Sequence, residues 1–264
     1  MEKKSSTTTD SESSKWGTSP LSGISVAVLS DPLESLIVAR LVEFSALLRR
    51  FGVVVPPTSP KALEMLSACP ESRKREIQRE WEVRLSWLRP TTLISSADRH
   101  NLDTQREREL TEIALKHHRL RARSEFWDTF KQGEVIEVYG LNMIQLYRSL
   151  SFFQFCGYSL LDISVHEWYV LWDRPKRAIE LLIRCAEKAL STEVPVEAFD
   201  LPPHVIRESY QTGLTEEFHP RAYMVEFKHY GSLIGPDDRP AGFICTSLRE
   251  FLAEGEDALE INFV

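Results

Sequence analysis

The sequence lacks the marks of secreted, zinc-binding and membrane-spanning proteins. Its four cysteines lie far apart and form no CxxC pair, which argues against a zinc site or a disulfide framework and fits a reducing compartment. It has no stretch of about 18 apolar residues, so no membrane span is predicted. No apolar run follows the first lysines, which argues against a secretory signal. We therefore expect a cytoplasmic protein without a membrane partner.

An excess of positive charge and the familiar catalytic motifs are also missing. The formal net charge is -7, so no global basic field would attract nucleic acid. The sequence contains no GxGxxG or GxxxxGK phosphate loop, no GxSxG elbow, no HExxH motif and no kinase motif set. These absences argue against nucleic acid as a partner. They lean away from an enzyme without deciding the question.

What is present is the composition of a globular protein with two tails. Apolar residues make up 42% of the 264 residues, which is enough for a packed core in one or two domains. Residues 1–22 are rich in serine, threonine and charge and predict a disordered tail, and residues 253–264 predict an acidic C-terminal tail. Between the tails we expect three parts, at 23–100, 101–132 and 133–252.

Helix signals are clear in the part at 23–100. Asp31 and Pro32 predict the N-cap and first turn of an amphipathic helix over 33–51, and Gly52 predicts its end. Two more helices are predicted, over 61–68 and 71–88.

Short apolar runs in the same part leave its fold class open. The runs at 24–29, 53–55 and 91–95 each have the composition of a buried strand. Together with the helices they predict a βαβαβ segment with a parallel sheet, which we favour slightly. The competing interpretation is a mainly helical region with short extended links.

A long charged helix is predicted from Asn101 or Asp103 to about Lys131, ended by Gly133. So polar a helix usually connects domains or pairs with another helix. The candidates for such a helix pairing in a homodimer are its apolar residues, which are Leu110, Ile113, Leu120, Phe126 and Trp127.

The part at 133–252 predicts an antiparallel α+β fold. Strands are expected over 134–139 and 143–148, short helices follow, and Asp173 caps a helix that reaches about Leu190. Extended segments are expected in 193–199 and 205–210, then a hairpin of 222–230 and 242–248 whose alternating pattern marks half-buried strands. The whole chain is therefore α+β, or mixed α/β and α+β if the first part contains a sheet.

This order of elements resembles the PAS domain family over about residues 125–252. Phe155-Cys156-Gly157-Tyr158-Ser159-Leu160-Leu161 is similar to the family's LGYS-x-x-E-L step, with Gly157 expected to end one short helix and Ser159 to cap the next. The helix from Lys176 and the strand Gly242–Leu248 carry the rest of the resemblance. Trp172-Asp173-Arg174-Pro175 departs from the His-Pro-Glu-Asp that the family often has.

The resemblance implies a domain that senses a small molecule or contacts proteins, with a preceding helix that often mediates dimerisation. Aromatic and apolar residues of the part at 133–252 either line a pocket or fill the core, and we favour a filled core. These candidates are Phe152, Phe155, Tyr158, Trp168, Trp172, Leu182, Tyr223, Val225 and Phe227.

No cofactor is expected. The reactive-cysteine motif of flavin photoreceptors is missing, and Cys156 has the apolar setting of an inert, buried thiol. Haem would need an axial ligand, and His166, His204 and His229 are weak candidates.

Three hypotheses for function follow. The first is a cytoplasmic regulatory or signalling protein, most simply a homodimer, whose PAS-like domain mediates protein interaction or senses a small ligand; we lean toward protein interaction. The second is a transcription-associated regulator that binds nucleic acid through basic patches of 73–123. The third is an enzyme with a small-molecule pocket in the PAS-like half.

Overall fold

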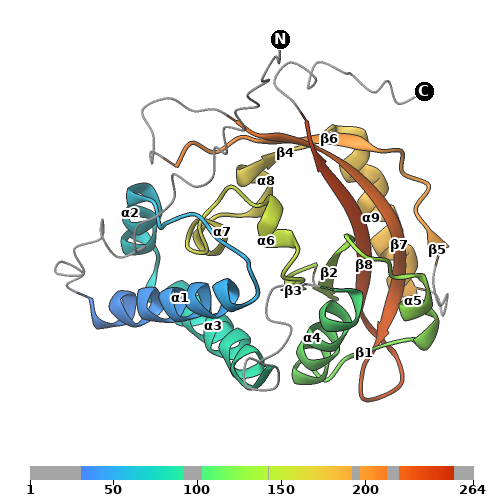
Figure 1. The fold of residues 1–264 in the computed structure, drawn as a ribbon, viewed down its shortest axis with the longest axis horizontal. Helices are drawn as coiled ribbons and strands as arrows, with labels where there is room; N and C mark the ends of the chain where they lie inside the picture. Colours follow the sequence, from blue (N-terminus) through green and yellow to red (C-terminus); the bar gives the residue numbers. More distant parts are fainter. Residues whose placement is uncertain (1–30, 92–102, 142, 192–196, 213–219, 253–264) are drawn as a thin grey trace, which may run out of the picture.

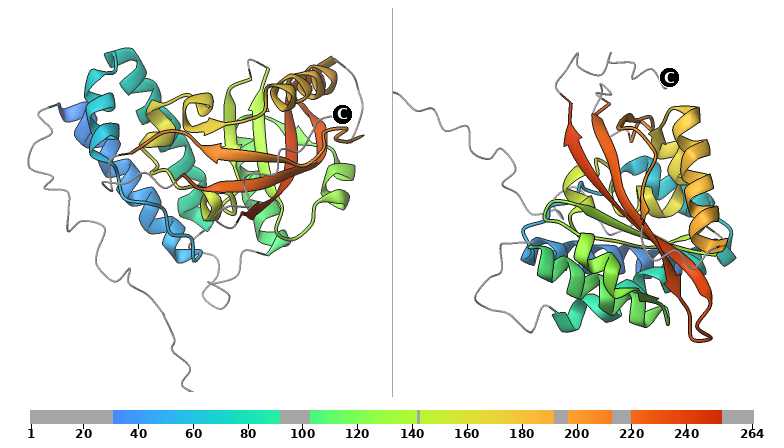
Figure 2. Two further views of the ribbon diagram at one scale, coloured as in Figure 1. Left: turned by 90° about the horizontal axis from the view of Figure 1, so that it is seen from above. Right: turned by 90° about the vertical axis from the view of Figure 1, so that its right-hand side faces the viewer.

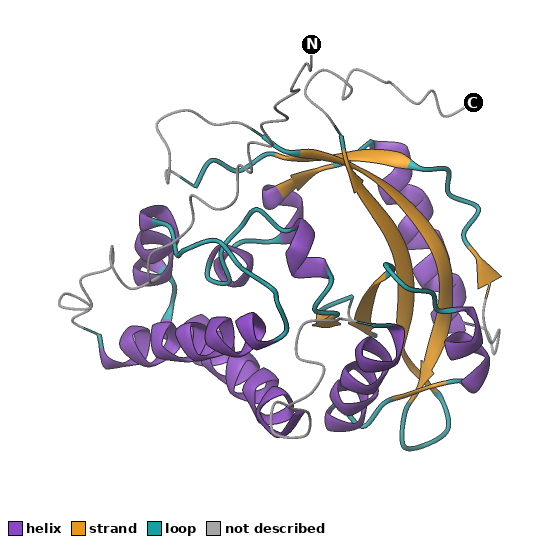
Figure 3. Ribbon diagram, viewed as in Figure 1, coloured by secondary structure: helices purple, strands orange, loops and turns teal. Residues whose placement is uncertain are grey.

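The computed structural model describes residues 31–91, 103–141, 143–191, 197–212 and 220–252. It has the expected α+β class, with helices flanking one curled antiparallel sheet (Figure 3). Figure 1 shows the helices of the first described range on one side and the longest strands on the other. We call residues 31–91 the helical region and residues 133–252 the sheet region.

The helical region consists of α1 (Pro32–Arg50), α2 (Pro60–Ala68) and α3 (Glu71–Thr91). The N-terminus of α1 is capped as expected, because Asp31 Oδ1 accepts a hydrogen bond from Leu33 N at 2.8 Å. Its end is also as expected, with Gly52 in the left-handed region at φ +75°.

The parallel sheet favoured for this region is not supported by its described residues, among which no strand occurs. Residues 53–55 belong to no strand, and Val53 and Val55 are buried while Val54 is 68% exposed. The run is a buried link that leads to Pro56 and Pro57, so its apolar residues serve the core of a helical layer. The strand predicted at 24–29 lies outside the described residues, as does 91–95 apart from the last helical residue.

The helix predicted over 103–131 is shorter than expected, because α4 runs only from Thr104 to His117. Arg119 takes a left-handed conformation at φ +56°, and Leu120 N donates to Leu115 O at 2.8 Å, which closes the helix end. This end lacks the usual glycine, so no residue in the sequence marks where the helix stops. The two-residue strand β1 (Arg121–Ala122) and α5 (Ser124–Thr129) follow.

The sheet has the strand order β3-β2-β8-β7-β6-β4, and β1 and β5 each pair with β7 outside this path. All pairs are antiparallel. In chain order the elements after α5 are β2 (Val135–Gly140), β3 (Gln145–Arg148), α6 (Phe152–Phe155), α7 (Asp162–Val165), α8 (Trp168–Leu171), β4 (Trp172–Asp173), α9 (Lys176–Ser191), β5 (Glu197–Ala198), β6 (His204–Glu208), β7 (Ala222–Ile234) and β8 (Pro240–Phe251).

The predicted hairpin is present and longer than expected. Its register runs from Tyr223 opposite Phe251 to Ile234 opposite Pro240, with an irregularity after Phe227. Figure 1 shows this long pair arching beside α9, and α9 contacts both strands.

The helical region and the sheet region share one hydrophobic core. Phe44 of α1 contacts Trp81 of α3 and Phe153 of α6, at ring centroid distances of 4.9 and 6.3 Å. Trp87 of α3 contacts Tyr147 of β3 at 5.4 Å. Figure 2 shows α1 and α3 lying beside the sheet region in its left-hand view. The two regions therefore pack as neighbours and do not behave as separate globules.

Candidate functional site

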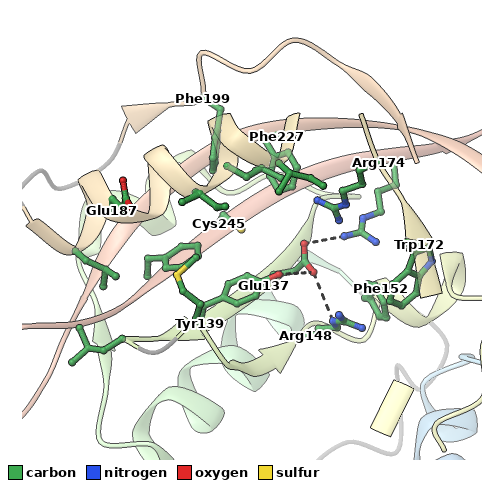
Figure 4. A pocket seen from close by; sticks show the side chains of 18 of the residues that line it. Glu137, Tyr139, Arg148, Phe152, Trp172, Arg174, Glu187, Phe199, Phe227 and Cys245 are labelled. Carbon is green, nitrogen blue, oxygen red and sulfur yellow. Dashed lines mark hydrogen bonds and ion pairs between the residues drawn. The ribbon is translucent and has the colours of Figure 1, made fainter. Parts of the chain in front are cut away.

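A cavity of about 450 Å³ lies between the sheet and α9 (Figure 4). This is within the range of about 300 to 1,000 Å³ that is typical of small-molecule sites. The sheet contributes residues from β2, β3, β7 and β8, and α9 covers them. The cavity is chemically divided, with charged side chains at one end and apolar side chains at the other.

One carboxylate and three guanidinium groups form the charged end. We call them the arginine cluster, and its members are Glu137 of β2, Arg148 of β3, Arg174 between β4 and α9, and Arg249 of β8. Arg249 Nη2 donates to Glu137 Oε2 at 2.9 Å, and Arg148 Nε lies 3.7 Å from Glu137 Oε1. Figure 4 shows Arg148 and Arg174 near Glu137 at this end of the cavity.

The charges of this cluster do not balance. Burial acts to raise the pKa of Glu137, but the charges of Arg249, Arg148 and Arg174 outweigh it and hold the pKa below its usual value. Burial lowers the pKa of Arg174, and the negative charge of Glu137 offsets this only in part. The second lining carboxylate, Glu187, lies at the far end of the cavity in Figure 4. Counting side chains, the cluster carries three positive charges against one negative charge.

Aromatic rings hold the guanidinium groups in place. The guanidinium carbon of Arg148 lies 4.2 Å from the ring centroid of Phe152 and 5.3 Å from that of Trp172. Arg249 lies 4.9 Å from the same Phe152 ring, and Arg174 lies 6.0 Å from Phe227. Such contacts stabilise a cation over a ring face and leave the N–H edges of the guanidinium available for hydrogen bonds.

The other end of the cavity is apolar apart from Glu187 and reaches the surface. Leu141 and Met143 from the β2–β3 turn line it together with Ile183 of α9, and these side chains are 60%, 43% and 45% exposed. Deeper inside, Phe243 stacks on Tyr139 with ring centroids 4.8 Å apart. The exposed apolar residues therefore mark the mouth, while the arginine cluster lies in the interior.

Five of the nine predicted pocket residues line this cavity, namely Phe152, Trp172, Leu182, Tyr223 and Phe227. The filled core that we favoured over a pocket is wrong at this place, because packing of these aromatic residues leaves a cavity.

The other four predicted pocket residues are not in its lining. Phe155 packs on Phe251 instead, and Val225 is fully buried. The hydroxyl of Tyr158 donates to Leu171 O at 2.6 Å and accepts from Tyr210 N at 3.0 Å, so this side chain is a structural part of the core. The side chain of Trp168 lies outside the described residues.

Sequence reasoning missed the arginine cluster, although a signal for it exists. On β2, Glu137 and Tyr139 share a face, and on β8 the residues Phe243, Cys245 and Arg249 share the face toward the cavity. A charged residue on the inward face of a predicted strand is uncommon and usually has a partner. Asking for that partner would have singled out Glu137 and Arg249.

The expected cysteine and histidine candidates lie away from the cavity. Burial raises the pKa of the Cys156 thiol to about 11, in keeping with an inert, buried side chain. His166, His204 and His229 do not line the cavity, and burial lowers the pKa of His204 to about 4. Within the described ranges, no group of three or more histidine, cysteine or acidic side chains is placed to hold a metal ion.

Most of the dimer-helix candidates contribute to the core of the chain itself. Leu110, Phe126 and Trp127 are buried, Leu120 is half-buried, and Ile113 is 38% exposed. The expected pairing of one long helix with a second copy therefore has little apolar surface to use at this place.

Several cations of the basic stretch over 73–123 pair with acidic neighbours. Arg75 pairs with Glu71 and Arg108 with Glu112, both at the i,i+4 spacing of a helix surface. Arg89 makes a bidentate contact with the carboxylate of Glu43 at 2.6 and 2.8 Å.

None of the helices in the described ranges combines the length and apolarity that a membrane crossing requires. Comparison with known proteins gave no match to this chain, either among protein-family models or among curated proteins.

Proposed function

We propose that the sheet region is a PAS-like module that senses a small molecule, within a cytoplasmic regulatory protein. The observation that carries this proposal is the cavity of about 450 Å³ between the sheet and α9. It lies in the part of the chain on which the sequence resemblance rests. The order of elements there is two strands, short helices, a long helix and then antiparallel strands, which also supports the resemblance.

The chemistry of the lining favours binding over catalysis. Glu137 is engaged with Arg249 and Gln145, each at 2.9 Å, and its pKa is held below its usual value. Burial keeps the pKa of the Cys245 thiol well above its usual value, so this group stays protonated. Neither group has the poised pKa that a general base or a nucleophile needs at neutral pH.

A chain of ring contacts connects the cavity to the helical region. Phe152 lines the cavity and contacts Phe153 at 5.4 Å, and Phe153 contacts Phe44 of α1 at 6.3 Å. Beside Arg148, Tyr147 contacts Trp87 of α3. A ligand that orders Arg148 and Phe152 would therefore act on side chains that hold α1 and α3, which is the physical basis for proposing sensing.

The proposal is tested with the full-length chain and a plugged cavity. Native mass spectrometry of protein purified without dialysis should show a species heavier than the chain. Ile183→Trp should abolish it, because Ile183 is exposed at the mouth and a tryptophan there narrows the entrance without disturbing the core. Arg184→Trp is the matched control, on the next residue of α9, exposed and outside the lining.

Two results would contradict the proposal. One is a bound species that Ile183→Trp retains in full. The other is the absence of any bound species together with no thermal shift across a small-molecule library. Hydrogen exchange at α1 and α3 then measures the response, and sensing predicts slower exchange there when the cavity is occupied.

The homodimer expected from the sequence remains a separate proposal. If it forms, it uses surfaces other than Leu110, Phe126 and Trp127, since these side chains are buried within one chain. Light scattering of the full-length protein measures the oligomeric state directly, and a monomer would contradict this proposal while leaving ligand sensing untouched.

A further inference from the structure

The chemical division of the cavity indicates what kind of molecule it takes. Resting on the proposed ligand-sensing function, we infer that the ligand is an organic anion with an oxyanion head group and an apolar body. The head group lies at the arginine cluster, and the body extends along α9 toward the mouth between Leu141, Met143 and Ile183.

Charge is the first argument. The guanidinium groups of Arg148 and Arg249 both adjoin the one carboxylate of Glu137, in an interior where the Glu137 and Arg249 side chains are only 3% and 2% exposed. Uncompensated charge is costly in such surroundings, so an anion that enters gains from both desolvation and direct hydrogen bonds. A cationic ligand would be repelled, and a neutral ligand would leave the excess positive charge uncompensated.

The second argument comes from Arg148, whose guanidinium group is fixed by an aromatic ring but does not use all of its hydrogen-bond donors. Its side chain is 13% exposed, its guanidinium is stacked on Phe152, and its Nε has no hydrogen-bond partner among the described residues. The nearest acidic oxygen, Glu137 Oε1, is 3.7 Å away and beyond hydrogen-bond distance. Arg148 therefore retains a donor that the fold has fixed in position but has not used. The planar donor fork of arginine suits carboxylate and phosphate oxygens.

The third argument comes from the mouth of the cavity, whose apolar side chains favour a ligand with an apolar body. Exposed apolar side chains are normal when scattered, but three that line one entrance form a surface that an apolar body would cover. The inner wall on α9 continues this surface with Ile179 and Leu182. A small hydrophilic anion would leave both surfaces in water, so an acid with an alkyl or aromatic body fits better.

A matched series of ligands tests the head group on the unmodified full-length protein. The series is decanoate, decyl phosphate, decanol and decylamine, all used below their micelle concentrations, with binding measured by calorimetry. We expect at least one of the two anions to bind about tenfold or more tightly than decanol, and decylamine to bind most weakly. The two anions compared with each other tell whether the head is a carboxylate or a phosphate.

Variants then test the location of the head group. Arg148→Gln should weaken binding of the preferred anion about tenfold or more and leave decanol unchanged. Arg177→Gln, the same change on the solvent-exposed face of α9, should alter neither. Glu137→Gln should strengthen anion binding, because it removes the carboxylate that competes for the same arginines. Circular dichroism in the near ultraviolet verifies that each variant keeps its native fold.

The outcomes separate failure of this inference from failure of the proposed function. If decanol binds as tightly as both anions and Ile183→Trp abolishes that binding, the cavity takes ligands but the oxyanion inference is wrong. If Arg148→Gln and Arg177→Gln leave anion binding equally unaffected, the inference is also wrong. If no member of the series binds and the library test gives no thermal shift either, both proposals fail.

Discussion

Two buried carboxylates of this protein are stabilised in opposite ways. Between the helical region and α7, the carboxylate of Asp162 is fully buried and meets only neutral donors, from Ser59 and Ser159. We call these three residues the junction cluster. At the cavity, the carboxylate of Glu137 is buried among three arginines. The carboxylate of Asp162 is stabilised by hydrogen bonds from neutral groups, whereas the carboxylate of Glu137 is stabilised by an excess of positive charge.

The position of each cluster explains this difference. The junction cluster is buried, and Ser59 also caps α2, since Ala62 N donates to Ser59 Oγ at 3.0 Å. Each of its polar groups is used within the fold. The arginine cluster borders an open cavity and keeps an unused donor on Arg148. A buried polar cluster whose hydrogen-bonding groups all have partners therefore serves the structure. A buried polar cluster that keeps an unused donor beside a cavity is a candidate binding site.

The largest expected effect is on the junction cluster. Asp162→Ala leaves the Ser59 hydroxyl and the Ser159 amide and hydroxyl without their acceptor, and we expect it to lower the free energy of unfolding by about 3 to 4 kcal/mol. Urea titration measures this. Asp128→Ala on the exposed surface of α5 is the control, with a change within about 0.5 kcal/mol. Equal effects of the two substitutions would contradict a structural role for the junction cluster.

Another buried acid, Glu107, makes the stability of the fold depend on pH. Glu107 of α4 accepts hydrogen bonds from Leu150 N at 3.1 Å and Ser151 N at 2.7 Å. Burial raises the pKa of Glu107 from 4.5 to about 7, although these two donors act in the opposite direction. The folded state therefore keeps a proton over a pH range in which the unfolded state releases it.

The sign of the pH effect follows from this difference in proton binding. The stabilising contribution is complete below pH 4.5 and is lost as the pH rises through about 7, by about 3 kcal/mol in all. Urea titrations across this range should show a downward slope in wild-type protein relative to Glu107→Gln, which has no proton to lose. Parallel curves for the two proteins would refute the assignment.

The sequence predicted those parts of the fold whose signals are local. Asp31, Pro32 and Gly52 placed α1 within one residue at each end, and the alternation in 222–230 identified β7. The end of α4 was missed because Arg119, and no glycine, takes the left-handed conformation there.

The arginine cluster was missed for a different reason. Its members come from β2, β3, the segment before α9 and β8, so they meet only when the sheet has formed. Hydrophobic candidates such as Phe152 were found because aromatic residues stand out in any sequence. Arginines are common on surfaces, so nothing local marked Arg148 as buried.

A balanced ion pair beside the Gly157-Tyr158-Ser159 step offers a third case for the comparison. Arg221 and Glu208 pair at 2.7 Å, and a Cβ on Gly157 would lie 1.7 Å from the Arg221 guanidinium and 2.0 Å from the Glu208 carboxylate. Gly157 was expected to end a helix, but Cys156 does so, and a side chain at position 157 would displace the ends of the Arg221 and Glu208 side chains. Gly157→Ala should therefore cost about 1 to 3 kcal/mol in urea titration. Adding Arg221→Ala should recover part of that loss if the contact is its cause.

The smallest effect on stability is expected at the arginine cluster, and it tests most directly how this cluster differs from the junction cluster. Arg148→Gln removes one of the positive charges around Glu137, so the lost contact with Glu137 is offset by less repulsion from Arg249. We expect the free energy of unfolding to change by less than about 1 kcal/mol. A loss as large as that of Asp162→Ala would mean that Arg148 is needed for the fold itself. A small change together with weaker anion binding would mean that the fold tolerates this charge and the ligand uses it, which is the difference between a saturated cluster and a binding site.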